Sequence, residues 1–367
     1  MRLAAAALVV FAASLALATP AGAVSRRALQ EGAFSVSAPT APIRDVVITH
    51  PTPSEARDLA TASAAQSYPV NDGAGRTVQI QVSALCTAFC SDADPQTIAN
   101  FLGTLPHGDE ISLLTVEVVE PNLEMPADCG AVEAQACYYP DENRMFISGD
   151  DTTSPPPDNA TREFVISHEY GHHLANHRNN SPFNNPAIDW GPKNWASFAQ
   201  VCQGVRAGRY FPGDEGDHYR QNPGEAFAES FAHNRFPTDP VPWEWPDFPD
   251  PHTGAFPAIQ RDALHPWNGD SKQTRHGRFG KRRRRKRDVE RFATPLDGDM
   301  TLTLKGPDRA NLALKLKSAD GHTVARSNGP GSHEQVSHTI CGERELIGVV
   351  RRHGHRKSHF KLTALIP

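Results

Sequence analysis

The sequence predicts an α+β domain, in which a mixed sheet packs on active-site helices, followed by a small all-β sandwich. Strand-like and helical segments are mixed along the first two thirds of the chain. From Glu290 onward the pattern changes to short strands separated by turn residues, which is typical of a sandwich. Between these parts, one helical segment carries an H-E-x-x-H motif. A chain of 367 residues is long enough for about two such domains.

The first 23 residues are predicted to be an export signal. Met1-Arg2 gives a positive start, Leu3–Ala18 is an apolar run, and Ala21–Ala23 is a small-residue cleavage site. The alternative is a membrane anchor, but the run is shorter than the ~20 residues that span a bilayer. Residues 24–45 are predicted to be a flexible pro-segment or tether. We therefore expect a secreted, extracellular protein without a transmembrane anchor.

Six cysteines fit an oxidising compartment. An even number in an exported chain favours disulfides, and a cysteine zinc site is disfavoured because there is no C-x-x-C pair. We expect two local disulfides, Cys86–Cys90 and Cys129–Cys137. That pairing leaves Cys202 and Cys341, which fall in the two different domains.

The first domain is predicted to span residues 46–270. Alternation predicts strands, and longer apolar periodicity predicts helices. Pro140–Asn143 is expected to turn a hairpin, and Asp158 or Asn159 to cap the helix that follows and runs to about Arg178. The expected strands are Thr77–Val82, Ile111–Val119, Gln135–Tyr139 and Arg144–Ser148, and the other expected helices are Pro95–Leu105, Trp195–Ala207 and one begun by Asn222-Pro223.

The H-E-x-x-H motif is His168-Glu169-Tyr170-Gly171-His172. On a helix, His168 and His172 share a face and can bind one cation, while Glu169 lies within reach of a water on that cation. This is the zincin arrangement of two ligands and one general base. An ordinary helix with two surface histidines is the alternative. The apolar residues of the helix, and Gly171 as a space over the metal-facing turn, favour the metal site.

The third ligand must come from elsewhere in the chain. A metzincin has Gly and His three and six residues after the second histidine, but here Ala175 and Arg178 occupy those positions. Glu225 and Glu229 lie four apart on an apolar helix, where buried carboxylates are costly without a cation or donors. We predict that Glu225 binds the metal and that Glu229 accepts the N–H of a histidine ligand. The exchanged assignment of these two residues stays open.

H-E-Y-G-H followed by N-P-G-E-A-F-A-E-S-F resembles the gluzincins, among them the catalytic domain of anthrax lethal factor and the thermolysin-like enzymes. The resemblance covers Arg162–Phe231. It implies a zinc-dependent endopeptidase with one Zn²⁺, Glu169 as general base, and a protein or peptide substrate extended along an edge strand. Tyr219 or His218, just before the ligand helix, would stabilise the oxyanion. The alternatives are another zinc hydrolase acting on cell-wall peptides, and a catalytically silent surface- or matrix-binding protein on the same scaffold.

The tail, residues 290–367, contains M-T-L-T-L-K-G and L-A-L-K-L-K-S-A-D-G, and it is similar to the bacterial pre-peptidase C-terminal domain.

Residues 271–289 are predicted to be a basic linker. Its run Lys281–Arg287 is expected either to contact an anionic polymer or cell surface, or to be a processing site. No aromatic residue interrupts the run, so we expect no sequence-specific binding of nucleic acid.

Overall fold

The structure is a computed structural model that describes residues 64–86, 94–120, 124–129, 134–149, 160–180, 185–238, 241–280, 286–354 and 356–367. The predicted signal peptide and tether, Cys90, and the two predicted cap residues Asp158 and Asn159 lie outside these ranges. Among the described residues, no helix is both long enough and apolar enough to cross a membrane.

The first domain is built on a five-stranded mixed sheet in the order β1-β2-β3-β5-β4. Strands β2, β3 and β5 are parallel, while β1 and β4 pair antiparallel at the two edges. This confirms the predicted mixed sheet, including the hairpin of β4 and β5. The strands are β1 (Gln66–Pro69), β2 (Thr77–Val82), β3 (Thr115–Val119), β4 (Ala136–Tyr139) and β5 (Arg144–Ser148), with a two-stranded pair, β6 (Asn179–Asn180) and β7 (Asn185–Pro186).

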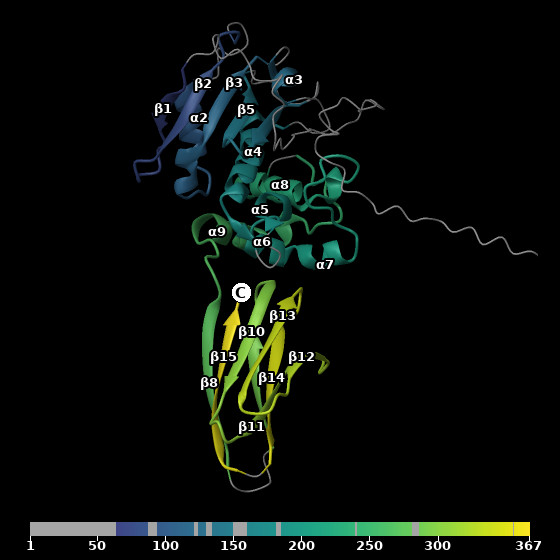
Figure 1. Ribbon diagram of the computed structural model, residues 1–367. Coiled ribbons are helices and arrows are strands. Elements are labelled where there is room, and N and C mark those ends of the chain that lie inside the picture. The colour runs from purple at the N-terminus through teal and green to yellow at the C-terminus, as the bar shows by residue number, and fades with distance from the viewer. Residues whose placement is uncertain are drawn as a thin grey trace, which may run out of the picture. The chain divides into compact units, whose positions relative to one another are not determined.

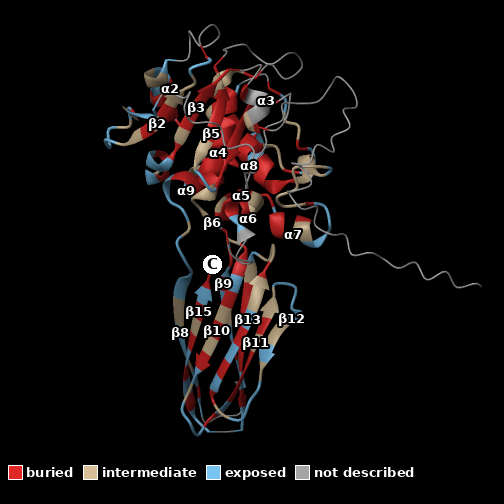
Figure 2. Ribbon diagram, turned by 45° about the horizontal axis from the view of Figure 1, so that its top comes forward, coloured by how far each residue is buried: buried red, intermediate tan, exposed pale blue. Residues whose placement is uncertain are grey.

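Helices α4 and α8 lie side by side in this domain, and almost every residue of both is buried (Figures 1 and 2). Thr161 caps α4 by accepting a hydrogen bond from the Phe164 amide, and Asn222 caps α8 as predicted. The helices are α2 (Pro95–Leu102), α3 (Glu124–Cys129), α4 (Arg162–Asn176), α5 (Ala187–Trp190), α6 (Lys193–Phe198), α7 (Val201–Arg206), α8 (Pro223–Arg235) and α9 (Phe256–Leu264), with short 3₁₀ turns η3 (Asp109–Leu113), η4 (Tyr219–Gln221) and η5 (Pro251–Thr253).

Two predicted elements of this domain were wrong in detail. The helix expected over Trp195–Ala207 is two helices, because Gln200 adopts a left-handed conformation (φ 56°) between α6 and α7. The strand expected over Ile111–Val119 starts only at Thr115, since the preceding residues form the turn η3. Alternating apolar residues are compatible with both a strand and a short 3₁₀ turn, so the pattern alone did not separate them.

The second domain is a sandwich of two antiparallel four-stranded sheets, ordered β13-β10-β15-β8 and β12-β11-β14-β9. Apolar residues of both sheets form one core between them. The strands are β8 (Ser271–Phe279), β9 (Arg287–Ala293), β10 (Gly298–Lys305), β11 (Asn311–Ser318), β12 (Thr323–Ser327), β13 (His333–Ile340), β14 (Glu345–His353) and β15 (Ser358–Ile366).

In the segment 271–289, which was predicted as a linker, the described residues instead form strand β8 and the start of β9. Of the basic run Lys281–Arg287, only residues 286 and 287 are described. Strand β8 pairs along its whole length with β15, from Ser271 opposite Ile366 to Phe279 opposite Ser358. The prediction failed because β8 is an edge strand on which most side chains are exposed and polar. Charged residues on an edge protect a sheet from pairing with other chains, and they also hide the strand in the sequence.

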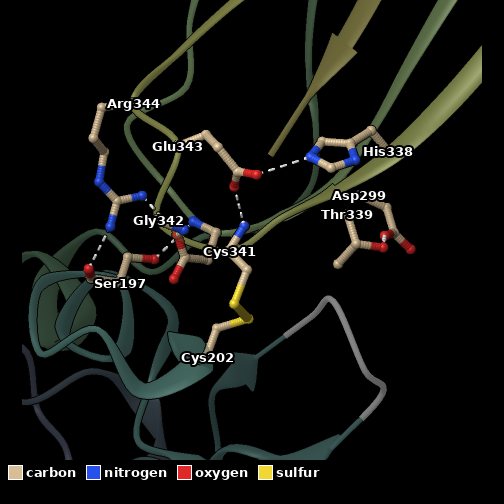
Figure 3. The surroundings of a disulfide bond; sticks show 10 residues. Ser197, Cys202, Asp299, His338, Thr339, Cys341, Gly342, Glu343 and Arg344 are labelled. Carbon is tan, nitrogen blue, oxygen red and sulfur yellow. Dashed lines mark hydrogen bonds and ion pairs between the residues drawn. A yellow bond between two sulfur atoms is a disulfide. The ribbon is translucent and has the colours of Figure 1, made fainter. Parts of the chain in front are cut away.

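Two disulfides join described residues. Cys129–Cys137 ties α3 to β4, as predicted. Cys202–Cys341 links α7 to the residue after β13, so the two cysteines left over by the prediction bond to each other. Near this bond, Arg344 donates to the Ser197 carbonyl (2.6 Å; Figure 3). Arg344 also forms an ion pair with Asp297 (2.6 Å). Cys86 is also disulfide-bonded, but Cys90 lies outside the described residues, so that pair stays a prediction.

Arg178, at the position where a metzincin has its third histidine, forms a buried ion pair instead. Its guanidinium lies 3.0 Å from Glu110, and the two side chains are only 7 % and 4 % exposed. It also donates to the carbonyls of Asp262 and Ala263 at the end of α9. Burial raises the pKa of Glu110, but the charge of Arg178 and the Gly108 amide outweigh burial and hold that pKa below 4.5.

We expect Arg178→Ala to lower the free energy of unfolding by about 3–5 kcal/mol, because the buried Glu110 carboxylate loses its cationic partner and keeps only hydrogen bonds from the Gly108 amide and the Tyr170 hydroxyl. Urea unfolding at pH 7 measures this effect, with the exposed Arg206→Ala as control. The lowered pKa of Glu110 also means that its stabilisation is present above pH 4.5 and is lost as the pH falls below it. An unchanged urea midpoint in Arg178→Ala would contradict this account.

Candidate metal centre

Three side chains predicted as ligands converge between α4 and α8. His168 and His172 come from successive turns of α4, and Glu225 comes from the first turn of α8. All three are buried, and they form a group that could hold a metal ion. The packing of the two helices thereby brings Glu225 next to two histidines that precede it by at least 53 positions in the sequence.

The distances between the ligand atoms fit a tetrahedral ion. The Nε2 atoms of His168 and His172 lie 3.2 Å apart. The Nε2 of His168 lies 3.5 Å from Oε2 of Glu225, and the Nε2 of His172 lies 3.5 Å from the other oxygen, Oε1. Zinc bonds of about 2.0–2.1 Å at tetrahedral angles would separate the ligand atoms by about 3.4 Å. The two imidazole nitrogens and the carboxylate therefore lie close to the spacing that one zinc ion requires, with one ligand atom of each within 4.8 Å of the others.

The carboxylate of Glu225 gives an independent test of fit. It is fully buried, and neither oxygen has a hydrogen-bond donor among the residues that the structure describes. A carboxylate in this state is strongly unfavourable unless a cation compensates it. Two imidazoles and one carboxylate form a donor set that zinc accepts, so the residues present fit the ion.

Glu229 lies behind His168. The Nδ1 atom of His168 donates to Oε2 of Glu229 at 2.8 Å, since a carboxylate only accepts. With the proton on Nδ1, the Nε2 of His168 presents its lone pair on the side of Glu225 and His172. The other oxygen of Glu229 lies 3.5 Å from Nε2 of His233. The geometry therefore favours Glu225 as ligand and Glu229 as the residue that orients His168.

The predicted catalytic residues occupy different surroundings. Glu169 is fully buried and lines the same pocket as His168 and Tyr219. His218 lies apart from this pocket: its ring stacks on Phe211 at 3.7 Å and its Nδ1 lies 2.8 Å from Asp214. Of the two residues predicted to stabilise an oxyanion, Tyr219 is thus the one beside Glu169.

The wall of this pocket opposite α4 was missed in the sequence. Val241, Pro242 and Trp245 supply it, and Trp245 packs 6.5 Å from the His168 ring and 6.1 Å from the Tyr219 ring, centre to centre. Arg220 lies over the Trp245 ring and pairs with Glu244, which fastens the loop. The two tryptophans of this proline-rich loop could have predicted that it packs against the protein, because tryptophan side chains are rarely left in solvent.

The substrate was predicted to lie extended along an edge strand of the sheet, and this stays a prediction. The two edge strands are β1, of which three residues are exposed, and β4, all four residues of which are buried. The pocket beside Glu169 is the described opening next to the candidate ligands.

Gly171 has a role that differs from the predicted one. Rather than leaving room over the metal-facing turn, it lies against α8: a Cβ at this position would be 2.7 Å from Cα of Ala228. The Ala228 backbone cannot move aside as a flexible side chain could. Gly171 therefore allows the two ligand-bearing helices to approach closely enough for Glu225 to reach both histidines.

We expect Gly171→Ala to push α8 away from α4, lower the free energy of unfolding by about 1–3 kcal/mol and weaken zinc binding at least tenfold. Thermal unfolding and zinc titration of the purified protein measure both effects. Gly280→Ala is the control, because a Cβ there meets nothing within 4 Å. Unchanged zinc affinity in Gly171→Ala would show that helix spacing does not set the site.

Comparison with protein-family models gave no match, and comparison with curated proteins gave none. Among solved structures, the pre-peptidase C-terminal domain of a collagenase from Bacillus anthracis is similar, with 11 % identity over 25 % of this chain and 88 % of that chain (TM-score 0.22). A periplasmic lysozyme inhibitor from Aeromonas hydrophila has 13 % identity over 27 % and 89 % (TM-score 0.21). An aminopeptidase from Legionella pneumophila has 9 % identity over 77 % of this chain but 36 % of its own (TM-score 0.23). At these scores the likenesses carry no functional argument.

Proposed function

We propose that the protein is a secreted zinc-dependent endopeptidase. The observation that carries the proposal is the convergence of His168, His172 and Glu225 at the spacing of a tetrahedral ion, beside a buried glutamate that is not a ligand. A zinc ion bound there would lower the pKa of a coordinated water toward ~7 and polarise a substrate carbonyl.

The protein's own residues supply the remaining chemistry. Glu169 takes the proton of the attacking water and returns it to the leaving amine. Tyr219 donates a hydrogen bond to the oxygen that becomes negatively charged. Glu229 holds His168 in the tautomer that binds the metal. The apolar wall formed by Val241 and Trp245 excludes water from one side of the reacting bond and favours an apolar side chain of the substrate there.

The test combines metal analysis with digestion. The purified protein is expected to contain about one zinc per chain, to cleave casein and a mixed peptide library, to lose this activity with a chelator, and to regain it with added zinc. A zinc-loaded protein that cleaves no peptide would exclude an endopeptidase. Release of amines from cell-wall peptides by that protein would then favour the alternative hydrolase, and no release would favour the silent binding protein.

A further inference from the structure

One arginine is buried at an end of the β-sandwich. Arg352 continues the inward-facing positions of β14, after Leu346, Gly348 and Val350, and is only 5 % exposed. One guanidinium nitrogen, Nη1, donates to the carbonyls of Gly280 (2.6 Å) and Arg356 (3.0 Å). The guanidinium carbon lies 5.4 Å from the centre of the Phe279 ring. These contacts fix the group between the two sheets.

Arg352 forms no ion pair with the described residues. Its Nε and Nη2 atoms are buried and have no acceptor within the described part of the chain. The ion pairs that the structure shows on the neighbouring strand β9, Arg275–Glu290 and Arg291–Glu345, involve other arginines. A desolvated guanidinium with two free donors is costly, and an anion from outside the chain would compensate it.

A second buried polar group lies at the same end. Ser358 is the Cα partner of Phe279, on which Arg352 stacks, and its side chain is 1 % exposed. Its hydroxyl also has no hydrogen-bond partner among the described residues. Two unsatisfied donors of one arginine and one unsatisfied hydroxyl therefore belong to residues that neighbour Phe279, by ring contact and by strand pairing. Unpaired buried polar groups in a native fold call for an explanation, and a bound oxyanion is one.

Exposed cations surround this end of the sandwich. The described ones are Arg278, Lys286, Arg287, Arg351, Arg356 and Lys357. Arg351 and Arg287 are direct partners across β14 and β9, and like charges placed opposite each other destabilise a sheet. Within the described residues, none of the six forms an ion pair, so this end of the sandwich presents a cluster of positive charge that would attract an anion.

We propose that this end of the β-sandwich binds an anionic polysaccharide that carries sulfate or phosphate esters, with Arg352 as its anchor. A planar guanidinium donates two parallel hydrogen bonds to a tetrahedral oxyanion, which a point charge cannot do. Single-stranded nucleic acid is disfavoured, because none of the described residues of this domain is an exposed Phe, Tyr or Trp, the strongest platforms for base stacking. The disulfides are typical of proteins outside the cytoplasm, where surface glycans are the available polyanions.

The experiment measures affinity of the full chain for dextran sulfate, dextran phosphate and unmodified dextran over a range of salt concentrations. We expect binding to at least one charged dextran and none to unmodified dextran. Arg352→Lys keeps the positive charge but cannot donate two parallel hydrogen bonds to one oxyanion. It should therefore weaken binding about tenfold. The double variant Arg356→Ala/Lys357→Ala should reduce the slope of log affinity against log salt by about two.

The control is Arg206→Ala/Arg326→Ala, which removes two exposed arginines elsewhere and should bind as the wild type does. Equal losses in the control and in Arg356→Ala/Lys357→Ala would overturn the site, and so would wild-type affinity in a folded Arg352→Lys. If Arg352→Lys does not fold, the affinity of Arg356→Ala/Lys357→Ala is compared with that of Arg206→Ala/Arg326→Ala. A loss confined to the first of these two variants supports the site. Tighter binding to duplex DNA than to either charged dextran at the same salt would overturn the polysaccharide partner.

Discussion

Glu169→Gln is expected to reduce peptide cleavage by about 10²–10⁴-fold while leaving the zinc content unchanged. The substitution is nearly isosteric, and Glu169 is fully buried in the wall of the pocket beside His168. An amide cannot accept a proton at neutral pH, so the chemical step loses its general base. The three candidate ligands are untouched. Casein digestion and metal analysis of the same preparation measure both quantities.

The control for this variant is Glu163→Gln, which changes another glutamate in the first turn of the same helix. It should leave both zinc and cleavage at the wild-type level. If Glu169→Gln retained full activity, Glu169 would not be the base and the proposed endopeptidase mechanism would be wrong. If it lost zinc as well as activity, the loss of cleavage could not be assigned to proton transfer.

The sequence predicted those parts of the fold in which local pattern and tertiary packing agree. Helix α4 has a continuous apolar surface, and Asn222-Pro223 is a local signal for the start of α8. The prediction failed where neighbours override the pattern. Gln200 breaks an otherwise helical segment, and the mostly polar strand β8 is held by its pairing with β15 and by the burial of Phe279 at its end. Neither the left-handed residue nor the pairing partner can be read from nearby residues.

More of the candidate site than of the fold could be predicted. The reason is that the side chains of a metal site must recur at spacings that can be recognised in the sequence. Histidines four apart and glutamates four apart each define one face of a helix. Gly171 shows the limit of this reasoning, since its contact with Ala228 depends on how the helices cross. The loop containing Trp245 shows a second limit: an aromatic residue predicts burial, but it does not reveal against which site it packs.

Glu225 and Glu229 are expected to differ sharply when each is replaced by alanine. Glu225→Ala should lower the zinc content from about one per chain to background, because one of three ligands is lost. Glu229→Ala should weaken zinc binding by about 10–100-fold, since it only releases the orientation of His168. Competitive titration against a zinc chelator of known affinity separates the two effects, with Glu163→Ala as the control. The reverse order would exchange the roles of the two residues.

The thermal unfolding midpoint, measured with and without zinc, is a second test of whether Glu225 binds the metal. It does not depend on enzyme activity. Zinc bound only to the folded chain stabilises it in proportion to the logarithm of its concentration over Kd, so the wild-type midpoint should rise with added zinc. In Glu225→Ala that rise should vanish. The metal-free variant should also be at least as stable as the metal-free wild type, because the wild type keeps a fully buried carboxylate without hydrogen-bond donors among the described residues. A metal-free variant that is clearly less stable would mean that Glu225 serves the fold rather than an ion.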